Sequence, residues 1–407
     1  MKRFIKQSEL LFYMVFLYYI ILMMYGGTMI MEKVPVQSWM YLIGRLLLVT
    51  SIICSFILNS IKINVKFFRN VIIIGLIISI IVLSTGYTVL FDAFLLSVLA
   101  SNLNLKTIFR YYFIVSSVFL VIVVLASLTG IIQNLVFLLG NIRRQSLGFI
   151  YPTDFASHLF YLWLTYWAFK KIKFNFGHVF IGIALSICVL QTSYAKLDAI
   201  LFILSTILFF VIDHITLRTK LQKKTLFFIG ICTFPICAFV SLILTSLYGH
   251  FHWIEELNKF VTFRISSGKD VMINNGLSLF GKYIRMQGNG WSPKGFDESF
   301  GYVFVDNAYI ATVLCYGVIF FVIVLISYFY AMYNFYLWGE NRLTIIFILV
   351  SISNLIDNKY LDPGYSPFFV IFYGYFLFNM GRKLKRYNKK KGNSRPNYCW
   401  ALKEYKR

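Results

Sequence analysis

Three basic residues stand in short connections between long apolar stretches of the chain. Arg143 and Arg144 are adjacent, and Lys196 lies in another such connection. A guanidinium group can hold two phosphate oxygens at once, and an ammonium group attracts them as a compact charge. Because these connections are short, the charges are not explained by a long solvated loop. The three residues therefore predict a binding site for an anionic ligand.

The elements that must position these residues are apolar helices. The chain has 407 residues, of which 59% are hydrophobic and only 14% are charged, whereas roughly a quarter of the residues of a soluble domain are charged. Its apolar blocks are about 17 to 25 residues long, which is the length of a helix that spans a bilayer. They lack the apolar–polar alternation of a membrane barrel. We predict an all-α, polytopic transmembrane bundle with spans near residues 9–30, 38–58, 70–85, 88–101, 111–130, 153–169, 177–192, 197–215, 226–247, 306–331, 342–357 and 364–381.

The basic residues between these blocks predict the orientation. Alternate connections carry clusters of Lys and Arg, and the positive-inside rule places such clusters in the cytoplasm. Both termini of this multi-pass protein of the cytoplasmic membrane are therefore expected to be cytoplasmic. A membrane domain over residues 1–381 would be followed by a basic tail, 382–407, which lies near anionic lipid headgroups. Nucleic acid is not expected as a partner, because the basic residues are dispersed as helix flanks.

One long outer loop, about 248–305, is expected between the ninth and tenth spans. It contains six of the basic residues on the outer face, including Arg264 and Arg285. Long loops escape the positive-inside rule, so a solvated loop explains these charges as readily as a binding site does.

Two charged residues lie inside apolar blocks. A charge in hydrocarbon is costly and rarely faces lipid, so Arg45 and Asp92 are expected to pair across neighbouring helices. Asp357 and Lys359 border the last outer connection, and nothing in the local sequence assigns them a role.

Four fragments of the expected outer face resemble the Wzy-type polysaccharide polymerases. Residues 143–154, RRQSLGFIYPTD, resemble the family's R-x-S-L-G-F-x-H-P-N segment, with Tyr151 and Asp154 in place of His and Asn. Residues 191–196, QTSYAK, resemble its T-x-S-R turn, with lysine in place of arginine. The pair Phe263-Arg264-Ile265 and Leu279-Phe280-Gly281, followed by residues 305–309 and 316–319, resembles the two ends of the family's large outer loop.

The resemblance, which covers about residues 140–320, implies an enzyme. It implies that the chain polymerises undecaprenyl-diphosphate-linked oligosaccharide units into capsule, exopolysaccharide or O-antigen at the outer face of the membrane. The leaving group would be a diphosphate, and Arg143, Arg144, Lys196 and Arg264 would bind it or stabilise its developing charge. No cofactor or metal is expected, because the lipid diphosphate already activates the donor. The flippase and the chain-length regulator of the same pathway are candidate protein partners.

The acceptor hydroxyl would need a general base. Asp306, at the junction of the outer loop and an apolar block, and His250, at the start of that loop, are the candidates. A helix N-cap or first-turn carboxylate is the common alternative role for Asp306. His158 lies four residues after Asp154, so the two could face each other on a helix and bind sugar hydroxyls, and Arg285 is a further candidate substrate ligand.

Two other functions remain open. A related ligase would transfer a finished glycan to another acceptor with the same outer loop and cations. A flippase or transporter of lipid-linked oligosaccharide would show repeated halves and charged cavities near the membrane midplane. The chain shows no internal repeat, and its excess of polar residues lies at one membrane face.

Overall fold

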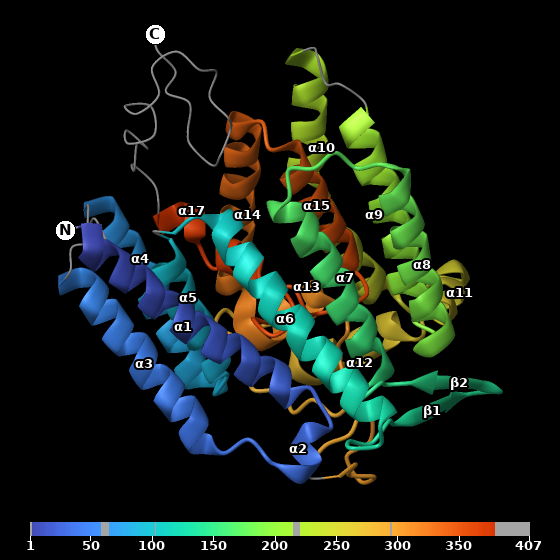
Figure 1. Ribbon diagram of the computed structural model, residues 1–407. Coiled ribbons are helices and arrows are strands. Elements are labelled where there is room, and N and C mark those ends of the chain that lie inside the picture. Colours follow the sequence, from blue (N-terminus) through green and yellow to red (C-terminus); the bar gives the residue numbers. More distant parts are fainter. Residues whose placement is uncertain (1, 58–64, 102, 215–219, 294, 379–407) are drawn as a thin grey trace.

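The structure is a mostly helical bundle with one small β-hairpin (Figure 1). The computed structural model describes residues 2–57, 65–101, 103–214, 220–293 and 295–378. Its longer elements are α1 (Lys2–Gly26), α3 (Ser38–Ile57), α4 (Val65–Thr85), α5 (Thr88–Ala100), α6 (Leu105–Leu128), β1 (Val136–Leu139), β2 (Ile142–Gln145), α7 (Pro152–Phe169), α8 (Phe176–Thr192), α9 (Lys196–His214), α10 (Lys220–Leu247), α11 (His252–Phe260), α12 (Arg264–Asn275), α14 (Gly317–Trp338) and α15 (Asn341–Ser353). The short helices are α2 (Ile30–Lys33), α13 (Ala308–Ala311), α16 (Phe369–Phe372) and α17 (Tyr375–Phe378), and a π-helical turn covers Thr312–Tyr316.

The helical membrane class is supported, but twelve spans are not confirmed. Among the described residues, five helical stretches are long and apolar enough to cross a bilayer: 67–85, 105–128, 196–214, 221–247 and 308–338. Five more of the predicted spans correspond to shorter apolar helices. The predicted span 153–169 corresponds to α7.

The predicted last span, 364–381, is wrong as a continuous helix. The described part of it contains only α16 and α17, each four residues long. Gly374 separates them with a φ of 110°, a left-handed conformation that interrupts a helix. Residues 379–381 and the predicted tail, 382–407, lie outside the described residues.

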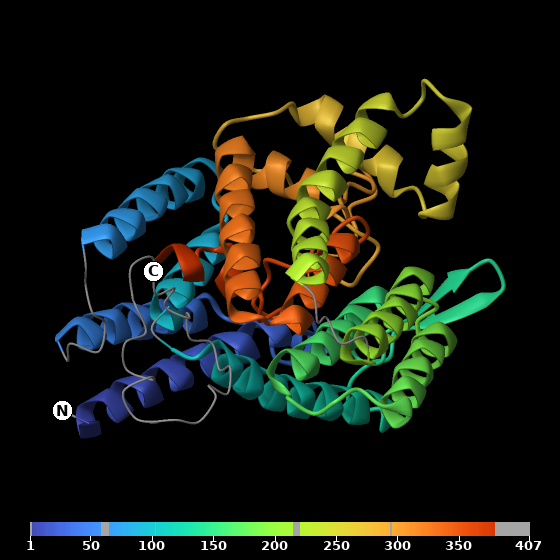
Figure 2. The same cartoon turned by 90° about the horizontal axis from the view of Figure 1, so that it is seen from above.

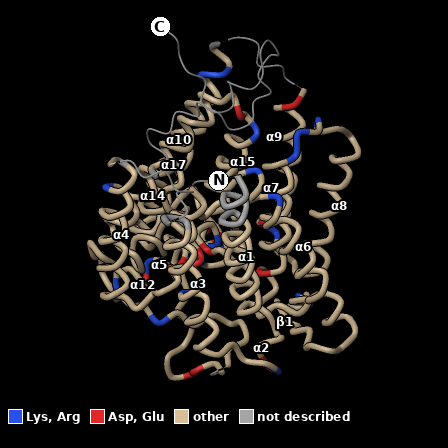
Figure 3. The backbone as a smooth tube through the Cα atoms, turned by 60° about the vertical axis from the view of Figure 1, so that its left-hand side comes forward, with Lys and Arg blue, Asp and Glu red and all other residues tan. Residues whose placement is uncertain are grey.

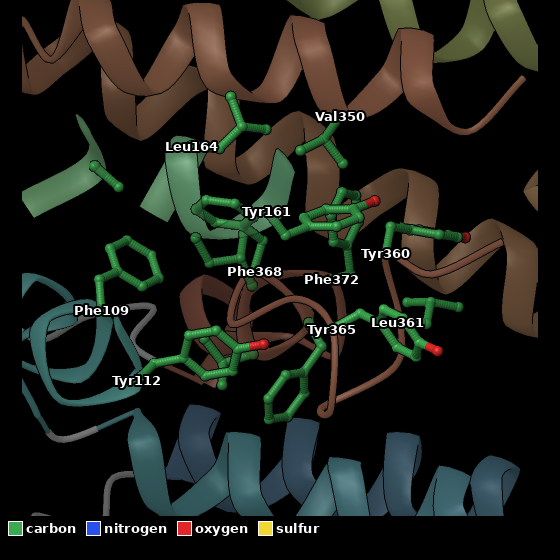
Figure 4. Close-up of a cluster of buried hydrophobic side chains, with 14 of the residues drawn as sticks. Phe109, Tyr112, Tyr161, Leu164, Val350, Tyr360, Leu361, Tyr365, Phe368 and Phe372 are labelled. Carbon is green, nitrogen blue, oxygen red and sulfur yellow. The ribbon is translucent and has the colours of Figure 1, made fainter. Parts of the chain in front are cut away.

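Apolar side chains lie both in the interior of the bundle and on its outer surface. Its interior is packed with aromatic residues from α6, α7 and the segment after α15, including Phe109, Tyr161 and Phe368 (Figure 4). Its outer walls also carry exposed apolar side chains, such as Leu83 of α4 and Phe180 of α8, at 86% and 75% exposure. A soluble bundle would cover such walls, so this surface is consistent with contact with lipid.

Charged positions gather near the ends of the bundle and in one central group, while most of the trace is uncharged (Figure 3). At one end, Lys106 lies 3.1 Å from Glu340 and Arg342 donates to Asp213 at 2.9 Å. Arg342 also donates to the carbonyl oxygen of Lys170. Three connections that were predicted to share the cytoplasmic side therefore meet at one end.

The expected pair inside the apolar blocks is confirmed. Nε of Arg45 on α3 lies 3.0 Å from Oδ1 of Asp92 on α5, and Asp92 is buried. This pair joins two neighbouring helices and keeps the carboxylate away from lipid.

Two glycines allow the long loop between α10 and α13 to enter the bundle. Residues 278–282 pack against the π-helical turn and the start of α14, where the N–H groups of Val318 and Ile319 donate to the carbonyl oxygens of Ser278 and Leu279. Gly281 and Gly317 have φ values of 79° and 88°, and a Cβ on either would overlap the backbone of the opposite segment. The fragments Leu279-Phe280-Gly281 and Tyr316-Gly317, separate in the sequence, are thus one packing unit.

Candidate functional site

The β-hairpin separates the two adjacent arginines. Arg143 pairs with Leu138 and Arg144 with Phe137 across the hairpin, and successive strand residues point to opposite faces. Arg144 turns toward the bundle, where Nε donates to the carbonyl oxygen of Ser193 at 2.9 Å. Its guanidinium also lies 5.5 Å from the centre of the Tyr151 ring. Arg143 is exposed, so only one of the pair belongs to the site.

The segment after the hairpin holds α7 in place. Gly148 has a φ of 89°, and a Cβ there would lie 2.9 Å from Ile132. Its carbonyl oxygen accepts from the N–H of Met29, and the N–H of Ile150 donates to Gly27. This close packing positions Tyr151 and the first turn of α7, which carries Asp154.

Arg264 is the first residue of α12 and reaches between two other segments. Nε lies 3.4 Å from Oδ2 of Asp306, and Nη1 donates to the carbonyl oxygen of Ile356. The guanidinium therefore joins α12, the start of α13 and the segment after α15. The predicted cap is a residue later than expected: Asn307 accepts from Tyr309 and Ile310, which leaves the carboxylate of Asp306 to Arg264.

The turn before α12 is strained and well anchored. Thr262 and Phe263 have φ values of 57° and 63°, which are unfavourable for residues with a Cβ. The buried Asn258 accepts from the N–H groups of Ile265 and Ser266 through its side-chain oxygen. Such strain persists where the surroundings fix the backbone, and here it determines where Arg264 begins the helix.

The segment after α15 contributes a second cation and a second carboxylate. Nζ of Lys359 lies 3.0 Å from Oδ1 of Asp154 and 4.2 Å from the centre of the Tyr365 ring. Oδ2 of Asp357 accepts from the hydroxyl of Ser157 at 2.5 Å. Burial raises the pKa of Asp357 to about 6, against the opposing effect of Lys359. A carboxyl group with such a pKa can accept a proton near neutral pH.

The pairing expected between Asp154 and His158 is replaced by other contacts. Asp154 is paired with Lys359, as described above, while the His158 ring stacks on Tyr365 with 4.0 Å between ring centres. His158 is buried, and its Nε2 has no hydrogen-bond partner in the part of the chain that the structure describes. Lys359 and Tyr365, both in the segment after α15, make these contacts, and the helical spacing alone does not report them.

These groups form one cluster, which we call the outer-end cluster after the sidedness that the sequence predicts, and which we define as Arg144, Asp154, Asp198, Arg264, Asp306, Asp357 and Lys359. Asp198, buried in the first turn of α9, is within electrostatic range of Asp357, Arg264 and Arg144. The aromatic side chains of Tyr151 and Tyr302 border it. The hydroxyl of Tyr302 interacts electrostatically with Asp306, Tyr151 and Arg264. Four connections of the chain, far apart in the sequence, therefore meet at the end of the bundle opposite Lys106 and Arg342.

The charges of the outer-end cluster are unevenly matched. Arg264 and Lys359 each have a carboxylate partner, whereas Arg144 has none within 4.0 Å among the described residues. Arg144 is thus the cation best able to receive an anion without losing an ion pair. Arg264 could do so by exchanging Asp306 for the ligand, which would also release that carboxylate.

Besides His158, four candidates from the sequence are not brought into the cluster. Arg285 pairs with Asp297 at 3.0 Å and lies over the Phe300 ring, so it joins two parts of the long loop between α10 and α13. Lys196 is exposed and lies 4.9 Å from the centre of the Tyr194 ring. His250 is exposed in the turn after α10 and, like Arg143, makes no side-chain contact with the cluster among the described residues.

The sequence assigns no site role to Asp357 or Lys359, and it predicts only a helix-capping role for Asp198. The signal for Asp357 and Lys359 was the group of polar residues within 357–362, between two apolar blocks, because buried charges there are costly unless they are paired. Among the described residues, no group of three His, Cys, Asp or Glu side chains is arranged to hold a metal ion.

Comparison with protein-family models, with curated proteins and with solved structures finds no match for this chain.

Proposed function

We propose that this chain joins lipid-diphosphate-linked oligosaccharide units into a polysaccharide at the outer face of the membrane. The observation that carries the proposal is the outer-end cluster, in which Arg264 contacts Asp306 and the segment of Asp357 at one end of a membrane bundle. The resemblance of residues 140–320 to the Wzy-type polymerases supports the same reaction. The positive-inside rule supports the sidedness, because the loops with Lys106, Lys170 and Arg342 meet at the other end.

The chemistry required is the transfer of one glycosyl group. The hydroxyl oxygen of the acceptor sugar bonds to the anomeric carbon of the donor while the bond from that carbon to the diphosphate breaks. The electron pair leaves with the lipid diphosphate, and the hydroxyl proton passes to a base. Cations near the diphosphate would lower the barrier by stabilising the charge that develops there.

The cluster supplies candidates for each role. Arg144, which has no carboxylate partner, and Arg264, which can exchange Asp306, are the groups we assign to the diphosphate. We assign the role of general base to Asp357, because its raised pKa, about 6, suits proton transfer near neutral pH. Asp306 takes that role if anion binding releases it from Arg264. Tyr151 and Tyr302 offer aromatic surface to sugar rings.

The test is reconstitution of the purified protein with a synthetic undecaprenyl-diphosphate-linked repeat unit, followed by separation of products by size. A ladder spaced by one repeat unit supports the polymerase. Transfer of a single unit to a different acceptor would indicate a ligase, and an unchanged band with transbilayer movement of the substrate would indicate a flippase. Either of the last two results would overturn the proposal.

A further inference from the structure

The helix α11, in the outer loop, has three distinct faces. Ile254 and Asn258 form the buried face, which packs toward α12. Trp253, Leu257 and Phe260 follow an i, i+4, i+7 spacing and so share a second face. Trp253 and Phe260 are 58% and 68% exposed, so this apolar face is largely uncovered.

The third face of α11 is charged. It carries His252, Glu255, Glu256 and Lys259, with Nζ of Lys259 2.7 Å from Oε1 of Glu256. An apolar stripe beside a charged stripe on a short helix is the pattern of a helix that lies along a membrane surface. The charged stripe can face water while the aromatic stripe faces the acyl boundary.

The position of α11 in the fold keeps it near the membrane. Only residues 248–251 separate it from α10, one of the stretches long enough to span a bilayer. The outward wall of α10 carries exposed apolar side chains up to its last residue, Leu247, so α11 follows directly on a helix whose wall is expected to face lipid. Figure 2 shows α11 and α12, in yellow, beyond α10 at the edge of the bundle.

We propose that α11 is an interfacial helix whose Trp253–Leu257–Phe260 face is seated in the bilayer, in the leaflet next to the outer-end cluster. Aromatic side chains are favoured at this depth, because their rings are apolar and their edges tolerate the polar headgroups. The partner is the lipid surface itself, not a second protein.

A seated α11 would also fix the position of Arg264. Asn258 of α11 accepts from the first N–H groups of α12, and only three residues, 261–263, join the two helices. Phe263, which immediately precedes Arg264, is 60% exposed. The inference that membrane seating presents Arg264 to a lipid-linked substrate rests on the proposed function, whereas the seating itself does not.

The seating can be measured by photo-crosslinking to labelled phospholipid. A photoreactive phenylalanine analogue is placed at position 253 or 260 on the apolar face, or at position 256 on the charged face as the matched control. In proteoliposomes of the full chain, positions 253 and 260 are expected to form several-fold more lipid adducts than position 256. Equal labelling at all three positions, or adducts at 253 and 260 that join two copies of the chain, would overturn the proposal.

A second measurement connects seating to activity. Phe260→Asp is expected to reduce lipid labelling from position 253 and to raise the KM for the lipid-linked substrate several-fold. Glu256→Gln, on the charged face, is expected to change neither. Unchanged labelling in Phe260→Asp would contradict the seating. If wild-type protein labels lipid as expected but makes no polymer, the proposed function fails and the interfacial helix stands.

Discussion

Nε of Arg144 donates to the carbonyl oxygen of Ser193 at 2.9 Å and so ties the β-hairpin to the turn between α8 and α9. The neighbouring Arg143 faces away and is exposed. Two identical side chains, adjacent in the sequence, thus differ in whether they belong to the outer-end cluster. Substitution of Arg143 is therefore a matched control for substitution of Arg144.

Arg144→Ala is expected to lower the rate of polymer formation by about 10²–10³-fold, the usual effect of losing one group that stabilises developing negative charge. Arg143→Ala is expected to retain most of the wild-type rate. The rates are compared in proteoliposomes with equal amounts of inserted protein. Equal losses in both variants would contradict a specific role for Arg144 and would attribute the effect to the general positive charge of the hairpin.

The pH dependence tests the assignment of Asp357. Burial raises its pKa to about 6, so the carboxyl group is protonated below that pH and cannot accept the proton of the acceptor. The rate is therefore expected to rise with pH through about 6 and then to level off. Asp357→Asn should lower the plateau by about 10²–10⁴-fold and remove this rise. A rise that persists in Asp357→Asn but disappears in Asp306→Asn would make Asp306 the base.

The ion pair of Lys359 and Asp154 predicts a stability difference. Lys359→Met leaves a buried carboxylate without its partner, and breaking such a pair costs about 3–5 kcal/mol. The double variant Asp154→Asn/Lys359→Met is expected to be more stable than the single variant. The free energy of unfolding can be measured by denaturant titration in detergent micelles. A double variant less stable than Lys359→Met would contradict the pairing.

Two glycines with similar backbone conformations allow the energetic cost of backbone strain to be measured separately from that of steric overlap. Gly281 and Gly301 have φ values of 79° and 72°, but a Cβ at Gly281 would overlap the Cys315 carbonyl, whereas one at Gly301 meets no atom within 4 Å. Gly301→Ala is expected to cost about 1–2 kcal/mol of unfolding free energy, from conformational strain alone. Gly281→Ala should cost more, because the loop must leave the π-helical turn. Similar melting temperatures for the two variants would contradict this packing.

Much of the helical architecture follows from the sequence. Apolar blocks of bilayer length predict helices such as α6 and α10, and the cost of a charge in hydrocarbon predicts the Arg45–Asp92 pair. The last predicted span fails because hydropathy does not report the positive φ of Gly374.

The candidate site was only partly predictable, for a similar reason. Arg144 and Arg264 stand out by residue type, and the structure brings both into the cluster. Arg143 looks equivalent to Arg144 because hydropathy gave no sign of a hairpin, whose alternation decides which side chain turns inward. Asp357 and Lys359 could not be assigned, because their partners Ser157 and Asp154 lie about 200 residues away in the sequence.

The central claim is that a polymerisation site forms around Arg264, and one assay tests it most directly. Wild type, Arg264→Ala and Arg143→Ala are reconstituted side by side with the synthetic lipid-linked repeat unit, and their products are resolved by size. We predict a ladder spaced by one repeat unit for wild type and Arg143→Ala, and only the starting band for equally well inserted Arg264→Ala. A normal ladder from Arg264→Ala would contradict the account.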